Sequence, residues 1–362
     1  MRSRDPIVGS AAPRGLGERW PAFTRLALAS GLALLGALYG FVLALDPYGT
    51  RAAPGRPVAP IMDLNQRYMY PQLARSGAFD AAVFGTSTIR LLDPERLDAA
   101  FGARFANFGL NAGTPWEQWQ LASLFLRHVP APSMLVFGLD TTWCDENDPQ
   151  LTVRSFPPWL YDEDRLNDLA HPVSLKSLEI AGRVLLNRLG LMPDRIRRDG
   201  FEVFTPREDR YDAARARVHI WSGRLDNAPL RPAVELSQAD RRHLTWPALA
   251  RLDGLLARVP PSTRTVLLLP PIHVAAQARP GSREEAIDRA CKEQIAGIAR
   301  KHSATLLDYR RPSPLTKDDS NYWDSLHYRL PVATRLIGDL RGALAGGAGN
   351  DIYTAWSPGG RR

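Results

Sequence analysis

The sequence predicts an α/β protein, a three-layer α/β/α sandwich with a five-stranded parallel sheet, preceded by one transmembrane helix. Three observations point to this class. An uncharged apolar run lies near the N-terminus, from Leu26 to Leu45. From Phe79 onwards, short apolar runs alternate with longer amphipathic stretches, the pattern of parallel strands covered by helices. The chain of 362 residues is also long enough for one such domain with an insertion.

The run from Leu26 to Leu45 is twenty residues long, enough for a helix that crosses about 30 Å of hydrocarbon. A cleaved signal peptide is the alternative, but its apolar core is usually about 7–15 residues long and precedes a small-residue cleavage site. Here the run is longer and ends in Asp46-Pro47-Tyr48-Gly49. Arginines precede it, so the positive-inside rule places the N-terminus in the cytoplasm and the main domain in the periplasm, anchored in a bacterial inner membrane.

The chain divides into a tail, an anchor, a linker and one folded domain. The stretch from Ala52 to Pro60, with its prolines and glycine, is typical of a linker. Segment 145–245 interrupts the alternation of strands and helices, and we interpret it as a partly helical insertion, a candidate cap over the sheet edge. The predicted boundaries are 1–25 for a cytoplasmic tail, 26–45 for the transmembrane helix, 46–78 for the linker and entry segment, 79–345 for the domain and 346–362 for a disordered tail.

Each element of the domain follows from its pattern. Short β-branched or apolar runs are the candidate strands, at 81–84, 105–108, 134–137, 265–269 and 305–307. Longer amphipathic runs fit helices at 116–128, 246–259, 283–302 and 331–344, with 175–189 as the best helix of the insertion. Pro115 and Pro247 lie where the first turn of a helix tolerates proline.

Charge and cysteine content exclude several classes of protein. The formal net charge is +8, but no basic block with interleaved aromatic residues forms a nucleic-acid footprint, so we expect no nucleic-acid partner. Cys144 and Cys291 are too few for a disulfide scaffold and have no spacing typical of a metal site. We expect them to be unpaired and to behave as small apolar side chains, with one disulfide between them as the alternative.

Ligands of an open parallel sheet bind beyond the carboxyl ends of its strands, so the residues after each strand carry the functional information. Ser87 follows the first predicted strand in Gly85-Thr86-Ser87-Thr88, where a helix N-terminus favours a developing oxyanion. Asp324 and His327 lie three positions apart after the fifth. A carboxylate against one imidazole nitrogen, with Ser87 at the other, would form a catalytic triad in the order Ser, Asp, His.

This arrangement resembles the SGNH (GDSL-like) hydrolase superfamily, and more closely its membrane-anchored bacterial branch, which includes the D-alanyl transfer protein of teichoic acid synthesis and polysaccharide O-acetylation proteins. The resemblance covers about residues 79–344. It implies a flavodoxin-like sheet, with Ser87 as the nucleophile and Asp324 and His327 as the last sequence block.

The resemblance also implies an oxyanion hole. An amide of the turn after the second strand, from Gly113 in preference to Gly109, would act together with the amide of Ser87. The third block departs from the pattern. Where many members carry Gly-x-Asn-Asp, this chain has Gly138-Leu139-Asp140-Thr141, which replaces an amide donor by a carboxylate acceptor.

Each candidate residue also has a structural alternative. Ser87 could cap the following helix, and His327 could be a buried structural histidine. His273, at the carboxyl end of the fourth predicted strand, is the rival base and otherwise a candidate substrate contact. Asp140 and Trp143 are further candidate substrate contacts, with hydrogen bonds to loop amides and packing under the insertion as their respective alternatives.

The expected function is O-acyl transfer to a cell-envelope or secreted polysaccharide, or ester hydrolysis on it, through an acyl-Ser87 intermediate. Transfer is favoured because the anchor holds the domain beside membrane-embedded acyl donors, and a membrane-bound acyltransferase is the candidate source of the acyl donor. No histidine pair has metal-ligand spacing, so we expect no metal, and no cofactor is implied. A catalytically silent polysaccharide-binding or assembly protein with the same fold is the alternative. The distance from Ser87 to His327 discriminates between the two.

Overall fold

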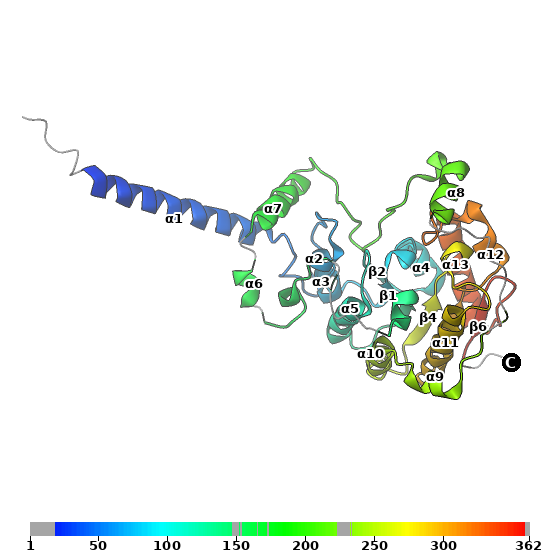
Figure 1. The fold of residues 1–362 in the computed structure, drawn as a ribbon. Helices are drawn as coiled ribbons and strands as arrows, with labels where there is room; N and C mark the ends of the chain where they lie inside the picture. The colour runs from blue at the N-terminus through cyan, green and yellow to red at the C-terminus, as the bar shows by residue number, and fades with distance from the viewer. Residues whose placement is uncertain are drawn as a thin grey trace, which may run out of the picture.

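Figure 1 shows a long N-terminal helix that projects from a mixed α/β domain. This computed structural model describes residues 19–146, 152, 154–164, 166–171, 174–222, 232 and 234–358. The strands are β1 (Ala81–Gly85), β2 (Phe105–Gly109), β3 (Met134–Gly138), β4 (Arg264–Leu269), β5 (Thr305–Asp308) and β6 (Thr354–Trp356). The α-helices are α1 (Arg19–Leu45), α2 (Gln66–Met69), α3 (Pro71–Arg75), α4 (Pro94–Phe101), α5 (Pro115–His128), α6 (Asn167–Ala170), α7 (Leu175–Arg188), α8 (Ala213–Trp221), α9 (Gln238–His243), α10 (Pro247–Leu256), α11 (Arg283–Lys301), α12 (Pro314–Lys317) and α13 (Leu330–Leu344). The 3-10 helices are η1 (Ser87–Ile89), η2 (Thr141–Cys144), η3 (Pro158–Leu160), η4 (Glu208–Arg210), η5 (Val274–Ala276) and η6 (Asp319–Asn321).

The domain is built on a mostly parallel sheet with the strand order β2-β1-β3-β4-β5-β6. β1 to β5 run parallel and lie within one residue of the boundaries expected from the sequence, whereas β6 pairs with β5 in the antiparallel direction. Every residue of β1, β2 and β3 is buried. A strand that is covered on both faces has no polar side, which explains why these segments appear in the sequence as nearly continuous apolar runs.

β6 corrects the predicted disordered tail and adds a sixth strand to the five that were expected. It occupies Thr354–Trp356, inside segment 346–362. The preceding Tyr353 is buried, and its ring stacks on that of Tyr309 with centroids 4.8 Å apart. Three residues are too few to show strand periodicity in a sequence, so pairing with β5 and the packing of Tyr353 decide the structure here. Residues 359–362 lie outside the described part of the chain.

α1 is the described helix that is long and apolar enough to cross a membrane, judged by its length and composition. The apolar span runs from Trp20 to Leu45, and an 18-residue window within it has a mean hydropathy of 2.1. The helix begins at Arg19 rather than at Leu26, because the single charge of Arg25 does not interrupt a helical backbone. Residues 1–18 of the predicted cytoplasmic tail lie outside the described residues.

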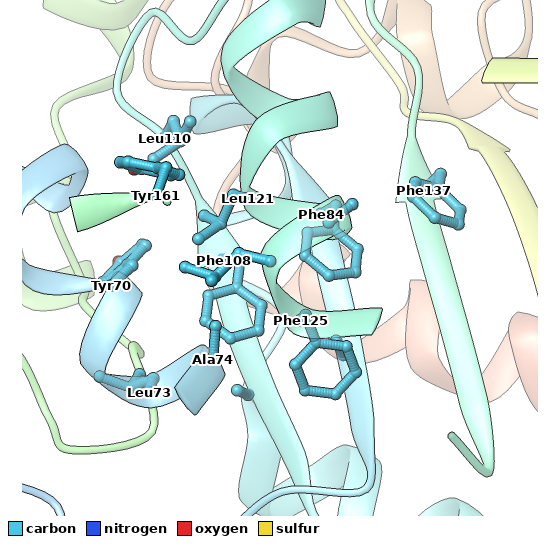
Figure 2. Close-up of a cluster of buried hydrophobic side chains, with 14 of the residues drawn as sticks. Tyr70, Leu73, Ala74, Phe84, Phe108, Leu110, Leu121, Phe125, Phe137 and Tyr161 are labelled. Carbon is cyan, nitrogen blue, oxygen red and sulfur yellow. The ribbon is translucent and has the colours of Figure 1, made fainter. Parts of the chain in front are cut away.

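The entry segment 46–78 belongs to the folded domain, so the predicted boundary at residue 79 is too late. α2 and α3 lie within it, and Tyr70 and Leu73 are buried in the same hydrophobic cluster as α5. Prolines and glycine upstream indicated a linker, but the apolar residues that follow pack against the sheet. Figure 2 shows this packing, with Tyr70 and Leu73 beside residues of β2 and α5.

Aromatic rings join the strands within this cluster. The ring of Phe84 in β1 stacks on Phe108 in β2 and on Phe137 in β3, with centroids 5.2 and 5.3 Å apart (Figure 2). The same cluster contains residues of α10 and α11. A second cluster lies on the other face of the sheet and includes residues of α4 and α13. Helices therefore pack on both faces, and the side chains of β1 alternate between the two clusters.

The insertion 145–245 contributes helices α6 to α9 and, among its described residues, no strand. Part of it covers the free edge of β2, where Asn107 N donates to Asp199 O at 2.8 Å. Gly200 follows with φ +86°, and a Cβ there would lie 2.1 Å from the oxygen of Asn107. Only glycine fits so close to the strand, and the contact protects an edge that would otherwise expose unpaired backbone groups.

Cys144 and Cys291 form a disulfide, so the expectation that they are unpaired is wrong. The two residues are 147 positions apart in the sequence. Cys144 ends η2, which follows β3, and Cys291 lies in α11, which follows β4. Because β3 and β4 are neighbours in the sheet, their following segments meet, and this proximity is invisible in the spacing of two cysteines.

Candidate active site

Three glycines leave the space in which the turn that carries Ser87 packs against the sheet. Ser87 begins η1, directly after β1. A Cβ on Gly85, Gly109 or Gly138 would lie 2.6, 2.9 or 2.3 Å from a side-chain carbon of Ile89. These glycines end β1, β2 and β3, so three neighbouring strands leave room for one isoleucine. Close packing of Ile89 therefore fixes the turn, with Ser87 at the carboxyl edge of the sheet.

Asn107 stabilises the same turn by hydrogen bonds to its backbone. Its side chain is fully buried in β2, and its Nδ2 donates to the carbonyl oxygens of Ile89 and Leu92 at 3.1 and 2.8 Å. Its Oδ1 accepts the amide of Gly109 at 2.9 Å. A buried amide with donors and acceptor all engaged stabilises one conformation, because any other would leave buried polar groups unpaired.

The structure brings Ser87, His327 and Asp324 together in one hydrogen-bonded chain. Ser87 Oγ lies 2.8 Å from His327 Nε2, and His327 Nδ1 lies 2.7 Å from Asp324 Oδ2. Both distances are within the range expected for hydrogen bonds between a nucleophile, its base and an orienting carboxylate. With Nδ1–H donated to Asp324, Nε2 is left as the acceptor that faces the serine hydroxyl.

The Asp-His loop, residues 322–328, explains why Asp324 and His327 are three positions apart. Asp324 Oδ1 accepts the backbone amides of Leu326 and His327, both at 2.8 Å, and this local turn brings the ring of His327 back over the carboxylate. Burial by itself would raise the pKa of Asp324, but the hydrogen bond and charge of His327 and the two amides outweigh it and hold the pKa below 3.8. Asp324 therefore remains a carboxylate at neutral pH.

The turn after β2 corrects the expected oxyanion donor. The amide of Gly113 donates to Leu110 O at 3.2 Å within the turn. Ala112 adopts φ +48°, the left-handed conformation that favours glycine, and its amide has no partner among the described residues. The amide of Ser87 is likewise without a partner there. Ala112 and Ser87, rather than Gly113 and Ser87, are therefore the candidate donors.

A buried ion pair supports this turn. Arg67 in α2 and Glu117 in α5 are fully buried, and Arg67 Nη2 lies 2.6 Å from Glu117 Oε2. Arg67 also donates to the carbonyl oxygens of Asn111 and Ala112, at 3.1 and 3.2 Å. Because the N–H and C=O of a trans peptide point in opposite directions, holding the Asn111 carbonyl inward turns the Ala112 amide away from Arg67.

The structure engages Asp140 in a helix cap and buries Trp143. Asp140 Oδ1 accepts the amide and the hydroxyl of Thr142, at 3.0 and 2.5 Å, and so caps η2. Trp143 is buried, and its Nε1 donates to Gln118 Oε1 at 3.3 Å. A position after a strand places a residue at the right edge of the sheet, but it does not determine whether the side chain turns toward solvent or toward the core.

His273 lies after β4 as expected, but its side chain is not exposed at the sheet edge. Its ring is fully buried, packed between Trp221 and Tyr322 with centroids 5.2 and 5.3 Å away. Its Nδ1 accepts the amide of Ala275 at 3.0 Å, and its Nε2 lies 3.1 Å from Asp319 Oδ1. His327 rather than His273 is therefore the histidine within hydrogen-bond distance of Ser87, and the ring of His273 is closed to solvent. Its backbone N–H donates to Ser325 O at 2.9 Å, so it supports the Asp-His loop from behind.

The buried ring of His273 gives a pH-dependent contribution to stability. Burial lowers its pKa below 6.5, and the facing Asp319 opposes this only in part. As the pH falls through 6.5, the unfolded chain takes up the proton more readily than the folded one, so stability is lost toward acid. Between pH 7.5 and 5.5 this residue can account for at most about 1.4 kcal/mol. We expect a smaller acid loss of unfolding free energy in His273→Gln than in the wild type; equal losses would contradict the assignment.

The insertion supplies side chains beside the base that the sequence did not reveal. The ring of Phe204 meets the ring of His327 edge to face, with centroids 5.2 Å apart. The guanidinium of Arg90 lies 4.4 Å from the centroid of Phe204 and pairs with Glu202. No local motif marks Phe204, because its role depends on the tertiary path of the insertion. For the pair of Arg67 and Glu117, the sequence contains one local signal, the capping box Thr114-x-x-Glu117 at the start of α5.

A cavity of about 440 Å³ opens near the carboxyl ends of β3, β4 and β5. Thr141, Ile272 and Arg311 are among its lining residues. Ile272 directly precedes His273, whose backbone N–H donates to Ser325 O in the Asp-His loop. Ser87, Asp324 and His327 are not among the residues that line the cavity, so the structure does not connect it to the serine.

Comparison with known protein families and with curated proteins gives no information on the chemistry of this site. No protein-family model matches the chain, and no curated protein matches it. Among the described residues, no group of three His, Cys, Asp or Glu side chains is arranged to hold a metal ion. The chain of Ser87, His327 and Asp324 is therefore the feature from which a function can be argued.

Proposed function

We propose that this chain is an SGNH-type O-acyltransferase or esterase that acts on a cell-envelope or secreted polysaccharide through an acyl-Ser87 intermediate. The observation that carries the proposal is the hydrogen-bonded chain from Ser87 through His327 to Asp324. The strand order from β2 to β5 is the flavodoxin-like one, and helices on both faces support a three-layer α/β/α assignment.

In the proposed mechanism, Ser87 Oγ attacks the carbonyl carbon of an acyl donor while its proton passes to His327 Nε2. His327 then returns the proton to the leaving oxygen, which departs and leaves the acyl group on Ser87. A carbohydrate hydroxyl next gives its proton to His327, attacks the acyl carbon and releases Ser87 Oγ, which takes the proton back. Asp324 holds the imidazole tautomer throughout, and the amides of Ser87 and Ala112 stabilise the oxyanion.

The catalytically silent alternative is weakened by one distance. A distance from Ser87 to His327 beyond hydrogen-bond reach would have favoured it, whereas the distance is 2.8 Å. The altered third block removes one oxyanion donor, because Asp140 is an acceptor that caps η2 and cannot donate to an oxyanion. Loss of one such donor typically costs about 10²–10³ in rate, so we expect a slow enzyme rather than an inactive one.

The acyl-enzyme is the direct test. The purified chain is incubated with an activated acetyl ester, with and without oligosaccharides, and digested for mass spectrometry. We expect a mass increase on the Ser87 peptide that is absent in Ser87→Ala and is discharged faster by an oligosaccharide than by water. Equal discharge rates would indicate a hydrolase. Absence of any adduct across several acyl donors, and no reaction with a phosphonate probe, would favour the silent alternative.

We further propose that α1 anchors the chain with the domain outside the cytoplasm. The Cys144–Cys291 disulfide supports this orientation, because disulfides persist in oxidising compartments and are rare in the cytosol. Alkaline phosphatase fused after Arg362 should therefore be active, and a fluorescent protein that folds only in the cytoplasm should be dark at the same position. The reverse pattern would place the domain in the cytoplasm, and release of the protein by alkaline carbonate would argue against the anchor.

A further inference from the structure

The end of α1 is covered by the domain, while the rest of the helix is bare. Every residue from Trp20 to Leu38 is exposed, and Tyr39 is the first that is half-buried. Val42 and Leu45 are buried in the hydrophobic core. The bare part that is described is about 28 Å long at 1.5 Å per residue, close to the roughly 30 Å of a bilayer's hydrocarbon. Tyr39 lies at its limit next to the domain, in a position where interfacial aromatic residues are enriched.

Two helices of the insertion lie beside this limit. α6 and α7 flank the C-terminal end of α1 (Figure 1). The hydroxyl of Tyr39 donates to Leu169 O at 3.0 Å, and Arg188 Nη2 donates to Leu45 O at 3.1 Å. If α1 spans the bilayer, the Tyr39 contact places α6 at the depth where the hydrocarbon ends, and the Arg188 contact places the end of α7 at the headgroup level next to it.

The segment 166–191, which contains α6 and α7, exposes apolar side chains at this level. Among the described residues outside α1, twelve large hydrophobic residues are exposed, and seven of them lie in this segment. Leu175 is 86% exposed and Leu166 78%. The other five are Leu169, Leu185, Leu186, Leu189 and Leu191. α7 buries a different stripe in the domain, formed by Ser177, Ile180, Ala181 and Val184.

Arginines accompany the leucines in the manner of a membrane interface. Arg51 donates to the carbonyl oxygens of Leu43 and Ala44 at 2.9 and 3.1 Å, and Arg188 binds the carbonyl of Leu45. Both guanidinium groups therefore lie at the helix end, about 6–9 Å beyond Tyr39 along the axis. That is the level of lipid phosphates, which attract cationic side chains whose stems pack on apolar surface.

We propose that α6 and α7, with the described residues 166–171 and 174–191, form an interfacial membrane element, which lies in the headgroup and acyl boundary of the leaflet next to the domain. Its leucines insert beside α1, and Arg51 and Arg188 bind lipid phosphates. The α/β domain is then held against the membrane at two places rather than by a flexible tether, in a fixed orientation relative to the bilayer. The proposal rests on α1 as a membrane anchor, and it does not depend on the acyl chemistry.

Depth-dependent fluorescence quenching tests the proposal on the full chain in vesicles of phosphatidylcholine and phosphatidylglycerol. Leu175→Cys and Leu189→Cys are each labelled with an environment-sensitive fluorophore, without reductant, so that the Cys144–Cys291 disulfide does not react. Val218→Cys on α8, 67% exposed, is the control on another surface of the domain, and Leu34→Cys reports on α1 itself. Nitroxides attached near the top or deep in the acyl chains are the quenchers.

We expect shallow nitroxides to quench the probes at 175 and 189 several-fold more than the probe at 218, and deep nitroxides to quench the probe at 34 most. Probes at 175 and 189 that behave like that at 218, while position 34 is in lipid, would overturn the proposal and favour a protein partner for this face. An unquenched probe at 34 would overturn both the anchor and the interface. None of these readings changes if Ser87 proves inactive, so failure of the proposed function remains distinguishable.

Discussion

Replacing His327 by alanine should slow the formation of acyl-Ser87 by about 10⁴- to 10⁶-fold, the range seen when the base of a catalytic triad is removed. The reason is geometric. His327 Nε2 is the partner of Ser87 Oγ at 2.8 Å, and without it the serine must lose its proton to water. Single-turnover kinetics with an activated ester, followed by mass spectrometry of the Ser87 peptide, measure the effect.

Asp324→Asn provides the second arm of this prediction. The side-chain amide introduced at position 324 can donate a hydrogen bond to His327 Nδ1. This bond stabilises the tautomer with its proton on Nε2, and a protonated Nε2 cannot accept the proton of Ser87. We expect a loss of about 10⁴ in rate with little change in fold, since the local turn needs only an oxygen acceptor.

His273→Gln is the matched control, because it changes a histidine at the same sheet edge that does not face Ser87. We expect it to retain most of the rate. The reverse ranking, with His273→Gln inactive and His327→Ala active, would move the base to His273 and contradict the geometry of the site.

The sequence predicted the central sheet well, because strands that are buried on both faces appear as nearly continuous apolar runs, as β1, β2 and β3 do. Elements whose stability comes from tertiary contacts were missed. β6 is three residues long and depends on pairing with β5, and α2 and α3 follow a proline-containing stretch that is typical of a linker. The disulfide was missed for the same reason, since two neighbouring strands bring its cysteines together.

The site was predictable where topology alone places a residue. Ser87, Asp324 and His327 converge because the segments that follow parallel strands meet at one edge of the sheet. The choice of Gly113 as an oxyanion donor could not be checked against backbone conformation in the sequence, and the structure engages its amide within the turn. Glycine is the residue expected at positive φ, yet here Ala112 adopts it and Gly113 closes the turn. His273 and Trp143 failed differently, since position after a strand does not reveal which way a ring turns.

Breaking the buried pair of Arg67 and Glu117 should produce the largest loss of stability. In Arg67→Met the Glu117 carboxylate remains buried without its cation, and the carbonyl oxygens of Asn111 and Ala112 lose their donor. Removing one partner of a buried ion pair typically costs about 3–5 kcal/mol, and we expect an unfolding free energy lower by that amount. Urea unfolding of the full chain in mild detergent measures it. Arg207→Met, which breaks an exposed pair with Asp209, is the control and should change little.

The double variant Arg67→Met with Glu117→Gln separates charge from hydrogen bonding. It removes both charges, and the amide oxygen of the new side chain can still accept the Thr114 amide that Glu117 accepts at 2.9 Å, so the double variant should regain part of the lost stability. It cannot replace the bonds to the two carbonyl oxygens. If those bonds orient the Ala112 amide toward the oxyanion, the double variant should form acyl-Ser87 about 10²–10³ times more slowly while folded. If the double variant acylates at the wild-type rate, Ala112 is not an oxyanion donor that Arg67 positions. If Arg67→Met is as stable as Arg207→Met, the pair of Arg67 and Glu117 contributes nothing to the stability of the fold.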